Sequence, residues 1–197
     1  PQSQLGQASN AFDASKTIVP VVAAVSFVHL LNDLIQAILP SIYPLLKTEY
    51  SLSFTQIGLI TLCFQLMASV LQPAVGLYTD KYPKPYLLPS GMVMTLLGLI
   101  LLALSSSFSM LLLASALIGM GSSTFHPEAS RVARLASGGR FGFAQSFFQV
   151  GGNAGSAFGP LLAAVIILPR GQTAIIWFSL FALLGIAVLS AVSRWTI

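Results

Sequence analysis

Six long apolar stretches follow one another along the chain, separated by short segments that carry charge, proline or glycine. They cover residues 18–46, 56–78, 86–105, 109–127, 143–168 and 173–195. An α-helix needs about 20 mainly apolar residues to cross a bilayer, and each stretch has about that length or more. Apolar side chains occur all round these segments, without the in-out alternation of a transmembrane β-strand. The pattern predicts an all-α membrane protein, a bundle of six transmembrane helices.

Composition narrows the class of protein further. Only 7% of the residues are charged and 55% are hydrophobic, whereas a soluble domain carries about 25% charged residues. Soluble enzymes and nucleic-acid-binding proteins are therefore excluded. The net charge of +4 comes from cations scattered between apolar runs, which form no basic patch for a nucleic acid. The lipid bilayer is the partner that this composition implies.

The distribution of cations predicts an orientation in the membrane. Residues 1–16 are mostly polar and are expected to form a disordered cytoplasmic tail, followed by a six-helix transmembrane domain over residues 17–197. With this tail inside, Lys47 and Arg170 are the two cations of the outer loops. The seven inner cations are Lys16, Lys81, Lys84, Arg131, Arg134, Arg140 and Arg194. Because cytoplasmic loops are enriched in Lys and Arg, the chain is expected to be N-in and C-in.

The segment between the second and third stretches carries a recognisable motif. Gly76 is followed by Asp80, Lys81 and Lys84, and this spacing resembles the corresponding loop of the major facilitator superfamily. The resemblance implies that these four residues, together with Arg131, form a cytoplasmic gate. We expect Asp80 to pair with Lys81 or with Arg131.

The fifth stretch shows two different faces. Gly151, Gly155 and Gly159 repeat every four residues, and with Pro160 they resemble the antiporter motif of drug/proton exchangers in the same superfamily. These glycines are expected to pack closely against another helix. The amides of Gln145, Gln149 and Asn153 lie about 200° away around the helix. They are predicted to line a cavity or to bond to a neighbouring helix.

Longer segments resemble one family within the superfamily. These are residues 29–33, 43–46, 65–72, 121–140 and 145–160, and they are similar to the amino-terminal half of the fosmidomycin resistance protein family. The resemblance implies the amino-terminal half of a major facilitator fold, built from 3+3 helix repeats. It also implies a proton-coupled drug antiporter of a bacterial inner membrane, which exports fosmidomycin or similar small molecules by alternating access. Its partner would be a carboxy-terminal six-helix half or a second copy of the chain.

Polar residues inside the first stretch are the first candidates for a site. His29, Asn32, Asp33 and Gln36 share one face of a helix because their spacing follows the helical repeat. Ionisable groups within a membrane are costly and usually functional. Asp33 is therefore a candidate for proton coupling or substrate binding, and a purely structural hydrogen-bonding role is the alternative. The predicted substrate-cavity residues are His29, Asn32, Asp33, Gln36, Gln65, Gln149 and Asn153.

Two further titratable residues flank Pro127 at the end of the fourth stretch. His126 and Glu128 are candidates to couple protons together with Asp33. Proline disturbs a helix, so the helix is expected to end near Pro127 and to be followed by a loop over residues 128–142. An ion pair of Glu128 with Arg131 or Lys81 remains an equal alternative for that carboxylate.

Other classes of function leave weaker signals or none. The sequence contains no phosphate-binding glycine loop, no zinc-binding spacing and no glycine-flanked nucleophile. We therefore expect no cofactor, no metal and no enzymatic activity. A non-transporting membrane subunit and a self-pairing half carrier remain alternatives. A membrane hydrolase using Ser122, Ser123 and His126 is a distant one.

Overall fold

The computed structural model describes residues 16–82 and 84–196, so nearly all of the predicted tail over residues 1–16 lies outside the described residues. Twelve helical segments are present in the described part of the chain. They are α1 (Val19–Ser41), α2 (Tyr43–Glu49), α3 (Phe54–Gln65), the π-helical η1 (Leu66–Val70), α4 (Leu71–Lys81), α5 (Leu87–Leu104), α6 (Phe108–Leu135), α7 (Phe141–Leu162), the π-helical η2 (Ala163–Ile167), α8 (Leu168–Arg170), the 3₁₀-helical η3 (Gln172–Phe178) and α9 (Ser179–Trp195).

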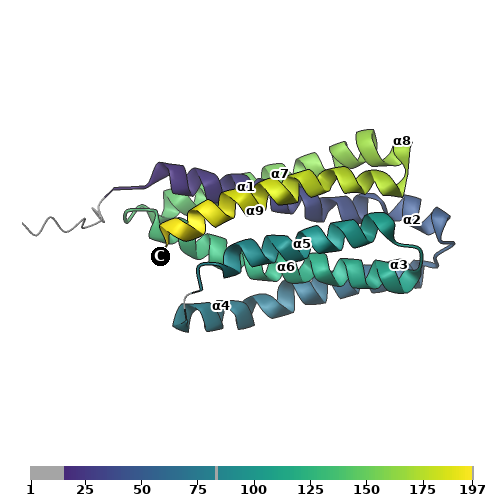
Figure 1. Cartoon of the computed structure of the whole chain (residues 1–197), viewed down its shortest axis with the longest axis horizontal. Coiled ribbons are helices and arrows are strands. Elements are labelled where there is room, and N and C mark those ends of the chain that lie inside the picture. The colour runs from purple at the N-terminus through teal and green to yellow at the C-terminus, as the bar shows by residue number, and fades with distance from the viewer. Residues whose placement is uncertain (1–15, 83, 197) are drawn as a thin grey trace, which may run out of the picture.

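These segments combine into six long antiparallel rods (Figure 1). Each rod is long and apolar enough to cross a membrane. The rods are Val19–Ser41, Phe54–Lys81, Leu87–Leu104, Phe108–Leu135, Phe141–Arg170 and Gln172–Trp195. The described residues contain no β-strand, which confirms the prediction of an all-α six-helix bundle.

Two helix pairs, α1 with α7 and α5 with α6, make the most extensive contacts in the bundle, and both rely on glycines. In α7, Gly151 and Gly155 lie directly against the backbone carbonyl oxygens of Ser26 and Leu30 in α1. In α5, a Cβ added to Gly91 would come within 2.9 Å of the Gly121 carbonyl oxygen of α6. Without side chains at these positions, the backbones approach closely, which is how helices gain contact in lipid.

The fourth rod is longer than the sequence pattern indicated. The prediction of a loop over residues 128–142 is wrong, because α6 continues through Pro127 to Leu135. The residues after Pro127 include Ala129, Val132 and Ala133, which are buried on one face. Packing of this face against the core offsets the local cost of the proline, so the helix persists. The connection to α7 is shorter than predicted and covers residues 136–140.

The first stretch, predicted as one helix over residues 18–46, is divided into two helices. Helix α1 ends at Ser41 and α2 begins at Tyr43. Pro44 has no backbone N–H to donate to the carbonyl of Pro40, so the regular hydrogen-bond ladder stops there. Pro40 and Pro44 therefore end the first rod at Ser41.

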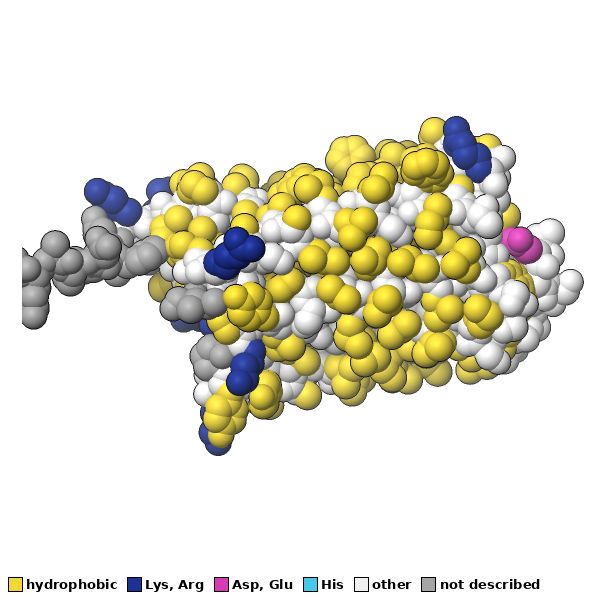
Figure 2. All heavy atoms as spheres, in the orientation of Figure 1, with side chains coloured by type: hydrophobic (Ala, Val, Ile, Leu, Met, Phe, Trp, Pro, Cys, Tyr) yellow, Lys and Arg dark blue, Asp and Glu magenta, His cyan; other side chains and the backbone are white. Residues whose placement is uncertain are grey.

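The surface matches the expected environment. Figure 2 shows hydrophobic side chains over the length of the bundle and Lys and Arg side chains near its two ends. Exposed apolar residues include Leu77, Val150 and Val165, which are 75%, 64% and 68% accessible. The carboxy-terminal end of α9 lies at the same end of the bundle as the start of α1 (Figure 1). This end holds the seven cations that the sequence assigns to one side; we call it the cation-rich end.

Candidate functional site

The polar face of α1 surrounds one carboxylate in the middle of the bundle. Asn32 Nδ2 donates to Asp33 Oδ1 at 3.1 Å, and Gln36 Nε2 donates to the same oxygen at 3.2 Å. His29 Nε2 lies 3.3 Å from Asp33 Oδ2, one helical turn away. The predicted grouping of these four residues on one helix face is therefore present, with Asp33 at its centre.

A second histidine reaches the same carboxylate from another helix. His126 of α6 places Nε2 3.2 Å from Asp33 Oδ1, although 93 positions separate the two residues in the sequence. We call His29, Asp33 and His126 the His–Asp–His cluster. It connects the first and fourth rods through side chains.

The other nitrogen of each histidine is held by the backbone. His29 Nδ1 lies 2.8 Å from the carbonyl oxygen of Phe148 in α7, and His126 Nδ1 lies 2.9 Å from the carbonyl oxygen of Ser122. A carbonyl oxygen only accepts, so both Nδ1 atoms carry hydrogen and donate. Each Nε2 atom is thereby turned toward Asp33, where it shares a proton with the carboxylate or presents a lone pair.

Packing fixes one histidine more firmly than the other. The His29 ring stacks on the Phe148 ring with 3.9 Å between centroids, and its side chain is 4% exposed. The side chains of Asp33 and His126 are 19% and 24% exposed. The cluster is thus anchored on the α7 side and remains accessible at its Asp33 and His126 edge.

Ser122 completes the hydrogen-bond network; the sequence indicates it only as part of the distant hydrolase alternative and not as a cavity or coupling residue. Its hydroxyl donates to Gln36 Oε1 at 2.9 Å and lies 3.2 Å from His126 Nδ1. The spacing of Ser122 and His126, four residues apart on a helix, is the signal from which this role could have been found. The carbonyl of Phe148 leaves no signal in the sequence, because every residue has one.

The remaining predicted cavity residues lie apart from the cluster. Gln65, Gln149 and Asn153 are exposed, and their side chains make no hydrogen bond among the residues that the structure describes. On α7 the amides occupy the face opposite to Gly151 and Gly155, which are buried. The bundle therefore presents polar groups on a surface that its own helices do not cover.

Glu128 takes part in a different interaction from that of its neighbour His126. Its buried carboxylate accepts from Arg131 Nη2 at 2.7 Å and from Arg131 Nε at 3.2 Å. The ion-pair alternative for Glu128 is therefore the one that the structure contains. Glu128 makes no contact with the His–Asp–His cluster among the described residues.

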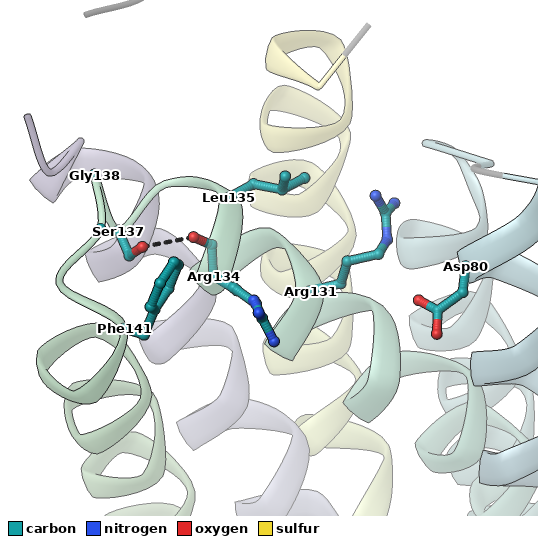
Figure 3. A pocket seen from close by; sticks show the side chains of 8 residues that line it. Asp80, Arg131, Arg134, Leu135, Ser137, Gly138 and Phe141 are labelled. Carbon is teal, nitrogen blue, oxygen red and sulfur yellow. Dashed lines mark hydrogen bonds between the residues drawn. The ribbon is translucent and has the colours of Figure 1, made fainter. Parts of the chain in front are cut away.

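Two of the predicted gate residues, Asp80 and Arg131, line a cavity of about 450 Å³ at the cation-rich end, together with Arg134 and Phe141. In Figure 3, Asp80 of α4 directs its carboxylate toward α6, which carries Arg131 and Arg134. The expected pairing of Asp80 with Lys81 or Arg131 is wrong for this structure, because no salt bridge of Asp80 occurs in the described ranges. Arg131 is instead engaged by Glu128, since that carboxylate lies one turn away on the same helix.

The other gate residues take separate positions. The Lys81 ammonium lies 5.5 Å from the ring centre of Tyr82, and Lys84 is exposed. Gly76 faces Pro127, with 3.7 Å between an added Cβ and the proline Cβ. Helix α4 therefore packs on α6 at Pro127, which lies between His126 of the His–Asp–His cluster and Arg131 of the gate.

Residues 25–196 match the Major Facilitator Superfamily. The chain belongs to this superfamily of membrane transporters, and it is a multi-pass membrane protein and not an enzyme. Among curated proteins, it is 60% identical over 195 residues to the Fosmidomycin resistance protein of Escherichia coli (strain K12). That match covers 99% of this chain and 48% of the relative. An uncharacterized MFS-type transporter, YfnC of Bacillus subtilis (strain 168), is 45% identical over 179 residues, or 91% of this chain and 44% of that protein.

Solved structures show the same fold at low identity. A mutant of the peptide transporter POT in complex with sulfate has a TM-score of 0.71 and 16% identity, and the match covers 86% of this chain and 37% of that one. A bacterial homologue of the human lysosomal transporter Spinster has a TM-score of 0.70 and 18% identity, with 88% and 42% covered. The chain spans about half the length of the curated relatives it matches and corresponds to the amino-terminal half of such a carrier.

Proposed function

We propose that this chain forms one half of a proton-coupled efflux transporter of the bacterial inner membrane, exporting fosmidomycin or similar small molecules by alternating access. The observation that carries the proposal is the His–Asp–His cluster, a titratable group of three side chains held between helices of a membrane bundle. The 60% identity to a fosmidomycin resistance protein supports the substrate class.

Proton coupling follows from how the cluster is connected. Because both Nδ1 atoms donate to carbonyl oxygens, protons enter and leave between the two Nε2 atoms and the carboxylate of Asp33. A change in this proton content changes the charge of a site that is open on one side. Asp33 and His126 are thus the coupling residues, and a substrate whose affinity differs between the two states would drive the exchange.

The uncovered amides support a second half as partner. Gln65, Gln149 and Asn153 are exposed on helices that are otherwise apolar, and lipid tails offer them no hydrogen bonds. If these amides line a cavity between this bundle and a second six-helix unit, water in the cavity hydrates them. In transporters built from repeats, the substrate site lies at such an interface near the middle of the membrane. The partner is the missing half or a second copy.

Orientation is proposed to be N-in and C-in, with the gate around Asp80 on the cytoplasmic side. Single cysteines at Lys47 and Lys84, in a Cys63→Ser background, test it. A membrane-impermeant thiol reagent added to intact cells should label the first position and not the second. External labelling at position 84 would contradict the orientation.

The decisive experiment compares Asp33→Asn with wild type in the complete carrier. In everted vesicles, fosmidomycin-dependent proton flux should fall by about 100-fold or more, because the group that exchanges the proton is removed. Glu49→Gln is the matched control, because this exposed carboxylate lies in α2, at the end of the bundle opposite the cation-rich end. The proton flux of this variant should equal that of wild type. Concentrative, pH-dependent export by Asp33→Asn at wild-type expression would refute the coupling role.

A further inference from the structure

We propose that His29, Asp33 and His126 form a binding site for one divalent transition-metal ion of the Zn²⁺ type. No local zinc-binding motif occurs in the sequence, because its two histidines lie on different helices. The fold brings their donor atoms together. This inference is independent of the transport cycle proposed above, since binding requires neither a substrate nor a gradient.

The separations between donor atoms suit one small ion. All three donor atoms lie within 4.8 Å of one another. His29 Nε2 lies 3.3 Å from Asp33 Oδ2 and His126 Nε2 lies 3.2 Å from Asp33 Oδ1, so the two histidines approach different oxygens of one carboxylate. Each separation is close to the roughly 3.3 Å between two donors of a tetrahedral ion with metal–ligand bonds of about 2.0 Å. Binding of one ion by all three residues requires a small movement of the donor atoms toward one another, and the partly exposed His126 side chain is the one with room to move.

The outer contacts of the histidines are those of metal ligands. A histidine that binds a metal usually donates its second ring N–H to a carbonyl or a carboxylate, which fixes the tautomer and leaves the other nitrogen free to ligate. His29 does this through the carbonyl of Phe148, and His126 through the carbonyl of Ser122. Both Nε2 atoms thereby face the carboxylate while the Nδ1 atoms are held by the backbone.

The donor set also indicates which ions would bind. Two imidazoles and one carboxylate favour Zn²⁺, Co²⁺ or Ni²⁺, whereas Mg²⁺ and Ca²⁺ prefer oxygen ligands alone. A divalent ion together with one carboxylate leaves a net charge of +1, which an anionic fourth ligand would offset. The exposed edge of Asp33 and His126 leaves a direction from which this ligand or a water molecule can approach.

Two neighbouring features add to the case. Asn32 Oδ1 is buried and has no hydrogen-bond partner among the described residues, so an acceptor beside the carboxylate is left unsatisfied. Gly152 lies against the cluster: an added Cβ would stand 2.5 Å from His29 Nε2 and 2.8 Å from Asp33 Oδ2. A side chain there would occupy the space beside the donor atoms, and glycine leaves it open.

The test measures metal binding by the complete carrier, purified in detergent without a polyhistidine tag. Titration with Co²⁺ should give the visible absorption bands of a tetrahedral site at one ion per chain, and Zn²⁺ should displace them. Loss of an outer partner of a metal ligand weakens binding roughly 10- to 100-fold. Loss of a ligand itself, in Asp33→Asn or His126→Gln, should weaken it at least about 100-fold.

Asp80→Asn is the matched control, because it makes the same chemical change at an exposed position and should leave the Co²⁺ affinity unaltered. Circular dichroism and gel filtration establish that each variant is folded. The proposal is overturned if the folded wild-type carrier gives no tetrahedral Co²⁺ spectrum, or if Asp33→Asn and His126→Gln retain its affinity. Neither result bears on the efflux experiment, which is performed without added metal.

Discussion

Helix α6 carries two titratable side chains, one on each side of Pro127, and they differ in how they are connected. His126 reaches across to Asp33 of α1, and the cluster is tied to α7 through His29. Glu128, two residues further, pairs with Arg131 of its own helix. The His–Asp–His cluster joins the first, fourth and fifth rods, whereas the Glu128–Arg131 pair lies within the fourth rod.

This difference determines which contacts persist and which contacts change when the helices move relative to one another. A contact within one helix survives when neighbouring helices move, so the Glu128–Arg131 pair can accompany α6 through a rearrangement. A contact between helices depends on their separation. In the His–Asp–His cluster, the proton content and the positions of the helices are therefore linked. In the gate cavity, Asp80 forms no ion pair among the described residues, so it is free to form one when the helices move.

The largest effect is expected from breaking the Glu128–Arg131 pair on its exposed side. The Glu128 side chain is 1% exposed and that of Arg131 is 22% exposed. Arg131→Gln leaves a buried carboxylate without its cation, which costs about 3 kcal/mol. Glu128→Gln leaves an arginine beside the gate cavity, where it can reach water, at a cost of about 1 kcal/mol or less.

The measurement is the free energy of unfolding, or the apparent Tm, of each variant of the complete carrier in detergent. The expected order is Arg131→Gln well below Glu128→Gln, with Glu128→Gln close to wild type. Equal losses of stability in both variants would show that the two side chains are equally desolvated in the full protein. Arg131 would then not reach water at the gate cavity, and the prediction would be wrong.

A second prediction concerns the space beside the His–Asp–His cluster. Gly152→Ala places a Cβ 2.5 Å from the His29 ring, which must move and pull away from Asp33. Overfilling a packed interior costs about 1–3 kcal/mol. Displacement of reacting groups by about 1 Å lowers activity by up to about 100-fold, so proton-coupled export should fall tenfold or more.

Gly142→Ala is the matched control in the same helix, because nothing lies within 4 Å of its added Cβ. The exchange of glycine for alanine should there leave export unchanged and raise helix stability slightly, by up to about 1 kcal/mol. Export assays and unfolding curves of both variants make the comparison. Normal export by Gly152→Ala would mean that the cluster tolerates displacement and has no coupling role.

The sequence predicts the rods well because hydrophobicity is a local property of each stretch. It also predicts the polar face around Asp33, since helical spacing alone places His29 and Gln36 beside it. The contact of His126 with Asp33 depends on packing between α1 and α6, which spacing within one helix does not report. The same holds for the continuation of α6 past Pro127, where burial of Val132 and its neighbours outweighs the local preference.

The gate shows the limits of a motif in the same way. The spacing of Asp80 and Lys81 indicates a loop of the superfamily, and the family match agrees. It does not indicate the partner of Arg131, because Glu128 competes for that guanidinium at a separation that is favourable on a helix. Ion pairs formed within one element are better predicted from its own sequence than from a motif elsewhere.

The smallest effect on stability is expected at Asp80. This carboxylate is exposed and forms no ion pair in the described part of the chain, so Asp80→Asn should change the free energy of unfolding by less than about 0.5 kcal/mol. If Asp80 instead acts when the gate closes, its removal alters transport and not folding. Export rate at saturating drug and apparent KM, measured in vesicles beside an unfolding curve, separate the two effects. Unchanged kinetics would remove Asp80 from the gate. A loss of stability as large as that of Arg131→Gln would show that Asp80 forms an ion pair in the complete carrier. Side chains of the gate would then join neighbouring helices, as those of the His–Asp–His cluster do.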